Sequence, residues 1–516
     1  MGTNTLTIRP DADVNRTITF TQAIANSGPY GHFVIGVATA NLNSTLTDAM
    51  VIAQNNVTID GFAMGGSTRR LNLTTSAAAL AGSCILNILG GSSGATIKNC
   101  ILNNQSSTAA KCIYINQFKG TTADVSPANT IISNNIIIAN DQTITATGGY
   151  GIQCSRSGSA TTKITGLQIL NNLITASGTG IAISYCNGAT ITGNEIKIEK
   201  ANSTSGGYGI NLVSSTGDIN IIANKFTETS TTKNSSTVDT YSIIVSANAS
   251  NPFNANIYNN FFSGIDRKAT GATTINQAYI GDIGYGTTKI YNNTFFLPAL
   301  TQPTVSGPYC ALRFTGSTYK ADVQNNIFVS NEDAKSVLIS NVITTGPVNY
   351  NVYYLSAGNT NARVVSTYPT LSAYQSANTS VDKNSTYANV NFTNAANGDL
   401  SLTGSSILDF NLSVPRLSVV STDINGNPRG TSYTYAGAYE STAFPTTALN
   451  QVKLNFTILP TQRGISINCE SGSDIEIFSV NGMQVAKVKN VSTYSQNLNN
   501  GIYVVKVNGV ATKFVK

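Results

Sequence analysis

The side chains best suited to chemistry form a small set of charged residues in or just after predicted strands. Three basic residues could hold or accept a proton: Arg313, Arg156 and Lys268. Three further charged residues could bind the substrate beside them: Asp266, Arg267 and Asp282. Acid–base chemistry of this kind needs a cation to neutralise a substrate carboxylate and a basic group to take the adjacent proton. Ordinary solvated surface charge is the other interpretation of these residues, and it is the one we favour.

The chain has one histidine, His32, in the segment GPYGHFVIG. One imidazole cannot build a His-rich zinc or iron centre, and a Ser-His-Asp triad would depend on it. The flanking glycines and aliphatic residues indicate a turn that enters a strand, which favours a structural role. We expect no metal site and find no cofactor motif.

Composition excludes several classes of protein. Of 516 residues 10% are charged, and 30 basic against 24 acidic side chains give a net charge of +6 without a basic run. We therefore expect no nucleic-acid partner. No apolar stretch is long enough to cross a membrane, and the opening MGTNTLTIRP lacks the apolar core of a signal peptide. We expect a soluble mature protein from which any export signal has been removed or never existed.

An internal repeat organises most of the chain. Its six-residue pattern places Asn fourth between aliphatic or aromatic residues, and nine intervals from Asp60 to Asn351 cover 291 residues, about 32 each. The copies are VTIDGF and IKNCIL as variants, then ISNNII, ILNNLI, ITGNEI, IIANKF, IYNNFF, IYNNTF, VQNNIF and VNYNVY. Strand-like alternation flanks each Asn, so the repeat unit consists of strands. We expect each fourth-position Asn to turn the chain in a left-handed conformation and to bond its counterparts in neighbouring coils.

A second strand recurs in each period, as in CIYIN, GIQCS, GINLV and CALRF. With a tight Asn corner and one long variable loop, the pattern predicts an all-β fold: a right-handed single-stranded parallel β-helix of about ten coils. The longest loops precede the second strand, so they should wall a groove over its outward residues. Alternation turns Tyr114, Gln153, Asn211 and Arg313 outward, and Arg156 follows its strand. Asp282 is ambiguous because Ile280 and Ile283 imply opposite facings.

The Asn corner, the three-strand coil and the variable loop resemble the pectate-lyase-like β-helix superfamily over roughly residues 58–354. The segments that follow, ending in DINGNPRG and YAGAYE, are similar to the closing pattern of secreted β-helix proteins of Bacteroidetes. Asp423, Arg429 and Glu440 in this closing pattern could be a catalytic cluster or an ion-paired clasp, and the clasp is favoured.

The sequence divides into three parts. Residues 1–56 are expected to form an N-terminal cap and the first strands, and residues 57–444 the β-helix with its closing segment. Residues 445–516 alternate as short strands with turns at Asn481-Gly482 and Asn508-Gly509, which predicts a small β-sandwich. This last part resembles the sorting domain of the type IX secretion system, although the usual early Asn-Pro motif is absent. The resemblance implies secretion or an outer-surface location in a Gram-negative bacterium.

Seven cysteines are present without a Cys-x-x-Cys motif. Cys84, Cys112, Cys154 and Cys310 lie in second strands, where we expect buried free thiols; a disulfide between Cys84 and Cys112 is the alternative.

The resemblance implies engagement of a complex carbohydrate, and whether the protein is an enzyme stays open. If it is a polysaccharide lyase, Arg313, Arg156 and Lys268 would be catalytic, Ca²⁺ would be implied, and the substrate would contact Tyr114, Gln153, Asn211, Asp266, Arg267 and Asp282. The Trp-Ile-Asp-His and Arg-x-Pro-x-x-Arg signatures of such lyases are absent, as are the carboxylate motifs of β-helix glycosidases. Binding or adhesion by a monomer is the favoured hypothesis. Tyr258 and Tyr291 could serve as sugar-stacking rings, and ordinary stacking between coils explains them equally well. A purely structural rod is the third.

Overall fold

A computed structural model gives the fold of most of the chain. The structure describes residues 5–21, 33–36, 50–52, 55–75, 84–105, 110–116, 118–119, 124–139, 149–155, 162–198, 207–228, 239–247, 252–264, 277–283, 286–299, 309–314, 320–331, 336–343, 346–356, 362–443 and 456–516. The chain forms two compact units, Met1–Phe444 and Pro445–Lys516.

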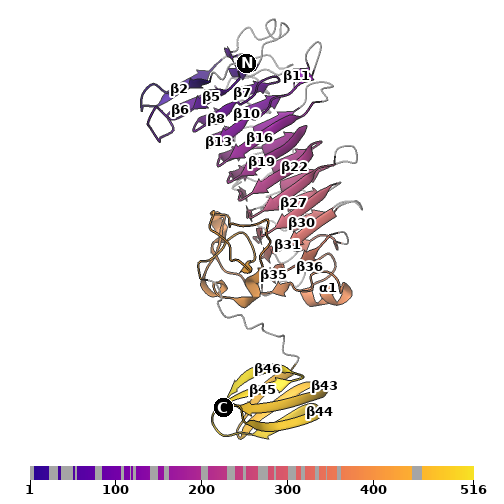
Figure 1. Cartoon of the computed structure of the whole chain (residues 1–516). Coiled ribbons are helices and arrows are strands. Elements are labelled where there is room, and N and C mark those ends of the chain that lie inside the picture. The colour runs from indigo at the N-terminus through magenta and orange to yellow at the C-terminus, as the bar shows by residue number, and fades with distance from the viewer. Residues whose placement is uncertain are drawn as a thin grey trace. The chain divides into compact units, whose positions relative to one another are not determined.

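Three long parallel sheets make up most of the first unit (Figure 1). Sheet A contains β1 (Leu6–Ile8), β5 (Val57–Asp60), β8 (Thr96–Lys98), β13 (Ile131–Ser133), β16 (Ile164–Leu170), β19 (Cys186–Thr192), β22 (Thr216–Ile222), β25 (Asn254–Tyr258), β28 (Thr287–Tyr291), β31 (Lys320–Gln324) and β34 (Val348–Asn349). Sheet B contains β2 (Arg16–Phe20), β6 (Leu71–Thr75), β9 (Ile101–Asn104), β14 (Ile136–Ala139), β17 (Leu173–Ala176), β20 (Glu195–Ile198), β23 (Lys225–Glu228), β26 (Phe261–Phe262), β29 (Thr294–Leu297), β32 (Ile327–Ser330), β35 (Val352–Leu355) and β37 (Thr386–Tyr387).

Sheet C is formed by the predicted second strands. It contains β4 (Met50–Ile52), β3 (Phe33–Ile35), β7 (Cys84–Leu89), β10 (Lys111–Asn116), β15 (Tyr150–Ser155), β18 (Thr179–Ser184), β21 (Gly207–Val213), β24 (Thr240–Ser246), β27 (Gln277–Ile283), β30 (Tyr309–Phe314), β33 (Ser336–Ile339) and β36 (Arg363–Val365). Successive strands visit the three sheets in turn, and each pairs in parallel with its equivalent in the next coil. The predicted right-handed parallel β-helix is therefore confirmed, and its strand pairing already begins at Leu6.

A ladder of Asn side chains runs through the interior at the corner between sheets A and B. Each Nδ2 group donates to the Oδ1 atom of the next Asn at 2.9–3.1 Å, from Asn135 through Asn172, Asn194, Asn224, Asn260, Asn293 and Asn326 to Asn351. The predicted ladder is thus confirmed, and each amide also donates to a backbone carbonyl, as Asn224 does to Ile191. Every rung is satisfied although it is buried.

Two details of the predicted corner are wrong. The residue in the left-handed conformation is the one before each ladder Asn, such as Asn134 at φ 56° or Asn259 at φ 55°, because the ladder Asn itself must point inward. Asp60 is not a ladder residue: it pairs in register with Lys98, two residues before Cys100. Its carboxylate accepts from Asn99 Nδ2 at 2.8 Å instead.

The interior is a stack of aliphatic and aromatic layers. In sheet B the rings of Phe226, Phe262, Phe295 and Phe328 stack at centroid distances of 4.7–4.9 Å. Beyond the last coil, helix α1 (Leu371–Ala377) packs Leu371 and Tyr374 onto the same core. The helix thus covers apolar side chains that an open end would leave in water.

A closing segment, residues 388–443, folds back over the outer faces of the later coils. It contains β38 (Phe392–Asn394), β39 (Asp399–Leu402), β40 (Ser413–Pro415), β41 (Tyr433–Tyr435) and 3-10 turns at Ala395–Asn397, Gly404–Ser406 and Phe410–Leu412. Val414 and Tyr435 pack against Ile327 and Val352 of sheet B. The closing segment therefore removes this part of the surface from solvent.

The predicted clasp holds this segment in place. Arg429 is buried, and its Nη1 atom donates to Glu440 Oε2 at 3.0 Å. Its Nη2 atom donates to Oδ1 of Asn259, a coil residue, at 2.6 Å. Asp423 accepts from the backbone N–H of Glu440 at 3.1 Å. These three side chains therefore fix the closing segment to the coils, as the clasp interpretation expects.

The second unit is an antiparallel sheet of β42 (Phe456–Thr461), β43 (Gly464–Ser479), β44 (Gln484–Asn497), β45 (Ile502–Val507) and β46 (Val510–Val515). The pairing of β43 with β44 shifts register between Asn468 and Ser473, and side chains from both halves of the long hairpin share one core. The predicted small sandwich is thus confirmed.

The cysteines are free thiols, and the six in the first unit are buried. The expected free thiols are confirmed, and the alternative disulfide between Cys84 and Cys112 does not form. In the described part of the chain no helix has the length and apolar character to cross a membrane.

Candidate functional site

The outer face of sheet C carries the predicted site residues in register. Tyr114 pairs with Gln153, Gln153 with Ala182, and Ala182 with Asn211. All three polar side chains are half-buried. The structure therefore places Tyr114, Gln153 and Asn211 in one column along the β-helix, one coil or two coils apart.

A second column, which the sequence interpretation missed, runs parallel to the first on the same face. Its members pair laterally in the order Lys111, Tyr150, Thr179, Tyr208 and Tyr241. The recurring triplets Tyr-Gly-Ile at Tyr150 and Tyr208 and Tyr-Ser-Ile at Tyr241 were the available signal. The Gly is required because a Cβ atom at Gly209 would lie 2.5 Å from the Ser242 carbonyl oxygen and 2.9 Å from the Phe226 ring.

Lys111 and Tyr114 form one polar centre at the N-terminal part of this face. The Lys111 ammonium lies 5.4 Å from the Tyr114 ring centroid. Burial lowers the pKa of Lys111 and raises the pKa of Tyr114. Both shifts favour the uncharged forms, so this centre is poorly suited to hold a strong net charge.

Tyr241 and Arg313 form a second centre toward the C-terminal part. Arg313 Nη1 donates to the Tyr241 hydroxyl at 2.5 Å, and its guanidinium carbon lies 6.0 Å from the ring centroid. The Tyr241 hydroxyl in turn donates to Asp239 Oδ2 at 3.1 Å. The guanidinium of Arg313, a predicted catalytic group, is therefore hydrogen-bonded to the Tyr241 hydroxyl, which is hydrogen-bonded in turn to the Asp239 carboxylate.

The surroundings of Tyr241 are apolar. Its ring is 1% exposed and packs with Ile244, Ala278 and Cys310, and Tyr208 stacks on it at 6.1 Å with an interplanar angle of 7°. A Cβ atom at Gly281 would lie 2.3 Å from the ring, so the ring occupies the space that this glycine leaves open. This end of the face is thus a packed tyrosine cluster.

The backbone at Asp282 explains its ambiguous facing. Ile280 pairs with Leu312 and Ile283 with Phe314, so Gly281 and Asp282 stand opposite Arg313 alone. This β-bulge shifts the register at the point where the alternation in the sequence is ambiguous. The predicted site residues Arg156, Asp266, Arg267 and Lys268 lie outside the described residues, as do His32 and much of the predicted loop wall.

The alternative pair of sugar-stacking rings is not available. Tyr258 and Tyr291 do stack, at 5.0 Å, but they are only 8% and 6% exposed because Val420 of the closing segment covers them. The Tyr291 hydroxyl donates to Asp322. Of the two explanations, stacking between coils is therefore the one that the structure supports, and sugar contact is not.

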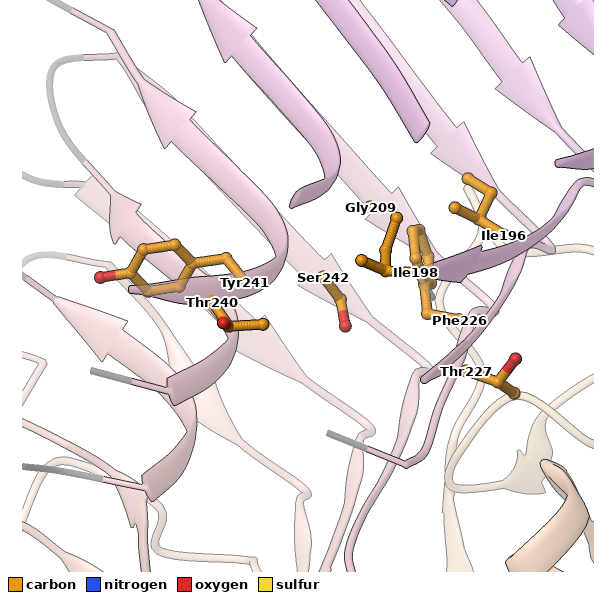
Figure 2. Close-up of a pocket in the computed structure, with 8 residues that line it drawn as sticks. All are labelled: Ile196, Ile198, Gly209, Phe226, Thr227, Thr240, Tyr241 and Ser242. Carbon is orange, nitrogen blue, oxygen red and sulfur yellow. The ribbon is translucent and has the colours of Figure 1, made fainter. Parts of the chain in front are cut away.

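A small cavity lies behind the face, where sheet B meets sheet C. Figure 2 shows its lining, which includes Ile198, Phe226 and Thr240, with the Tyr241 ring directed away from them. Its volume of about 10 Å³ has room for about one water molecule. It is too small for a sugar.

Within the described residues no group of three or more His, Cys, Asp or Glu side chains is arranged to hold a metal ion. The carboxylate that reaches the face is that of Asp239, which already accepts from Tyr241. The described residues thus offer aromatic rings, amides and engaged cations.

Comparison with known proteins yields only distant structural likenesses. No family model and no curated protein matches the chain. Among solved structures, it is similar to the GH136 lacto-N-biosidase from Eubacterium ramulus, with 10% identity, a TM-score of 0.30, and coverage of 69% of this chain and 66% of that one. It is also similar to a mutant tailspike protein of E. coli bacteriophage HK620 in complex with a pentasaccharide, with 10% identity, a TM-score of 0.19, and coverage of 97% and 85%. The chain thus spans just under two thirds of the lacto-N-biosidase, and at this identity neither likeness bears on function.

Proposed function

We propose that the protein binds a complex carbohydrate along the outer face of sheet C. The observation that supports this function is the pair of parallel columns: Tyr150 and Tyr208 in one, and Tyr114, Gln153 and Asn211 in the other. Tyrosine rings stack on the C–H faces of sugars, and side-chain amides bond their hydroxyls in both directions. Adjacent coils lie about 4.8 Å apart, so the columns present these groups at regular intervals to a linear polymer.

Binding to a glycan array followed by titration calorimetry tests this function. Tyr208→Ala should weaken the affinity for a retained glycan about three- to tenfold, because one stacking surface is lost. Tyr433, 52% exposed in the closing segment, is the matched control, and Tyr433→Ala should leave the affinity unchanged. The proposal would be contradicted if the protein retained no glycan, or if Tyr208→Ala left the affinity unchanged.

A second candidate function is β-elimination in a uronate polymer, and Lys111 is the observation that favours it. A lysine whose pKa burial lowers is more often a neutral amine and so a better base. Lys111 would take the proton from the carbon beside the uronate carboxylate, the C–O bond to the next sugar would break as a C=C bond forms, and Tyr114 would give a proton to the leaving oxygen. Arg313, Arg156 and Lys268 remain the basic groups predicted from the sequence, and a Ca²⁺ ion would be needed only for this reaction.

Ultraviolet absorbance of the unsaturated product measures this reaction. Lys111→Met should abolish it. Lys163 is a matched control, because its ammonium also lies over a tyrosine ring, 5.8 Å from Tyr185, but directly before β16 of sheet A. No absorbance rise with any uronate polymer, with or without added Ca²⁺, would exclude the lyase.

The location also belongs to the proposal. The resemblance of residues 445–516 to a type IX sorting domain supports secretion or display on the outer surface of a Gram-negative bacterium of Bacteroidetes type. Fractionation of cells that produce the protein with and without residues 445–516 tests this location. Size-exclusion chromatography with light scattering tests the expected monomer.

A further inference from the structure

Among the buried amide oxygens for which no hydrogen-bond partner is found, two lie two coils apart on the outer face of sheet C. They are Oε1 of Gln153 and Oδ1 of Asn211. A buried acceptor without a partner costs about 1–3 kcal/mol, so such atoms in a folded protein call for an explanation. Both lie in the same column, separated by one coil that carries Ala182 there.

The spacing of the two amides matches a repeating ligand. Two coils correspond to about 9.6 Å along the axis, because adjacent strands lie about 4.8 Å apart. This length is comparable with the disaccharide repeat of an extended polysaccharide. Half-buried side chains of this kind can turn their amide groups toward a ligand, whose hydroxyls would then donate to the unpartnered oxygens.

The charges on the described part of the face argue against an acidic ligand. The Lys111 ammonium lies over the Tyr114 ring, and burial lowers its pKa. Arg313 donates to Tyr241, which is itself bonded to Asp239. Strong recognition of a carboxylate uses a charge-assisted contact, often a bidentate guanidinium, and the Lys111 and Arg313 cations are already engaged. Amide oxygens turned toward a ligand would repel an anion.

We infer that the ligand of this face is a neutral, hydroxyl-rich polysaccharide, bound along the β-helix axis with Gln153 and Asn211 as hydrogen-bonding subsites two coils apart. The inference rests on the proposed function and narrows its substrate class. It also favours carbohydrate binding over uronate elimination.

Amide-to-carboxylate variants distinguish a neutral ligand from an acidic one. Gln153→Glu and Asn211→Asp keep the acceptor oxygens, so hydroxyl donors should still bind within about threefold of the parent affinity. Gln153→Leu and Asn211→Leu remove the acceptor, and each should weaken binding about tenfold. Gln168 is exposed on sheet A, and Gln168→Glu controls for the added charge.

Affinity electrophoresis and calorimetry against neutral glucans, mannans and xylans and against uronate polymers, at low and high salt, give separable outcomes. Retention of a neutral polymer, insensitive to salt and to Gln153→Glu, supports the inference. Retention of uronate polymers alone, weakened by salt and by Gln153→Glu, overturns the inference and leaves the proposed function standing. Retention of no polymer overturns both. Circular dichroism of each variant should match the parent, and a Leu variant that binds a neutral polymer as tightly as the parent would remove these residues from the site.

Discussion

Asn351 Nδ2 donates to Asp382 Oδ1 at 3.1 Å, so the interior Asn ladder ends on a carboxylate. The other oxygen of Asp382 accepts from the Tyr353 hydroxyl at 2.9 Å, and Ser385 also donates to this group. The side chain is fully buried, and this burial raises the pKa of Asp382 despite the three donors. The Asp382 carboxyl at the end of the ladder is thus more stable in its protonated form, because burial disfavours the charged form.

Asp382→Asn is expected to alter the pH dependence of stability. Because the pKa of Asp382 is higher in the folded state than in the unfolded chain, the folded state holds a proton that the unfolded state releases. This contribution to stability is complete at low pH and is lost as the pH rises through the folded pKa. The Asn variant should therefore lose stability less steeply between acidic and neutral pH, measured as Tm by circular dichroism.

Exposed Asp218 is the matched control for this experiment, and Asp218→Asn should leave the slope of Tm against pH unchanged. Parallel profiles for the parent and Asp382→Asn would show that Asp382 does not titrate in this range.

Asn224→Ala should destabilise the β-helix by about 3 kcal/mol, because it leaves several buried groups unpaired. Asn224 Oδ1 accepts from the backbone N–H and the Nδ2 group of Asn194, and its Nδ2 atom donates to Asn260. Urea unfolding followed by circular dichroism measures the free energy of unfolding. Asn254→Ala, at an exposed position of β25, should change it by less than about 0.5 kcal/mol. Equal effects at the two positions would refute the importance of the ladder.

Glu440→Ala should loosen the closing segment, because it leaves the buried Arg429 guanidinium without its carboxylate. Breaking a buried pair in this way costs about 3–5 kcal/mol. Hydrogen exchange should rise in residues 417–440. Burial and the charges of Asp322 and Asp218 raise the pKa of Tyr258 to about 12, and release of the segment should move its spectroscopic titration toward lower pH.

The exposed pair of Arg16 and Asp11, at 2.8 Å, is the control for this charge removal. Asp11→Ala should leave both the stability and the hydrogen exchange of residues 417–440 close to those of the parent. Unchanged exchange over residues 417–440 in Glu440→Ala would show that apolar packing alone holds the segment.

Gly281→Ala should displace the Tyr241 ring, since the added methyl group would lie 2.3 Å from it. The hydrogen bond from Arg313 would then break, and near-ultraviolet circular dichroism of the tyrosines should change. Tyr241→Phe keeps the ring and removes only the hydroxyl, so it should preserve the stacking with Tyr208. A near-ultraviolet spectrum of Gly281→Ala identical to that of the parent would contradict this packing.

The fold could be predicted because its cause is local and repeated. Each Asn corner carries its own signal, so the error at Asp60 did not disturb the other copies. The conformational role within the corner could not be assigned from the pattern, since Asn134 and Asn135 are the same residue type and only geometry separates the left-handed residue from the inward one.

The candidate site was less predictable because it depends on contacts between coils. Alternation within a strand was enough to turn Gln153 outward, but the engagement of Arg313 by Tyr241 joins residues 72 positions apart. Val420, far along the chain, covers Tyr258. This contact is not part of the repeat, so the repeat could not predict it.

The lateral register of sheet C has a consequence for how such a molecule could change over time. Since each coil contacts mainly its two neighbours, duplication of one period would insert an additional strand without altering those already present. The outer face would then lengthen by one step, about 4.8 Å, and gain one more position in each column. The length of polymer that the face could contact would therefore change in steps of one coil. The side chains at every existing position would stay the same.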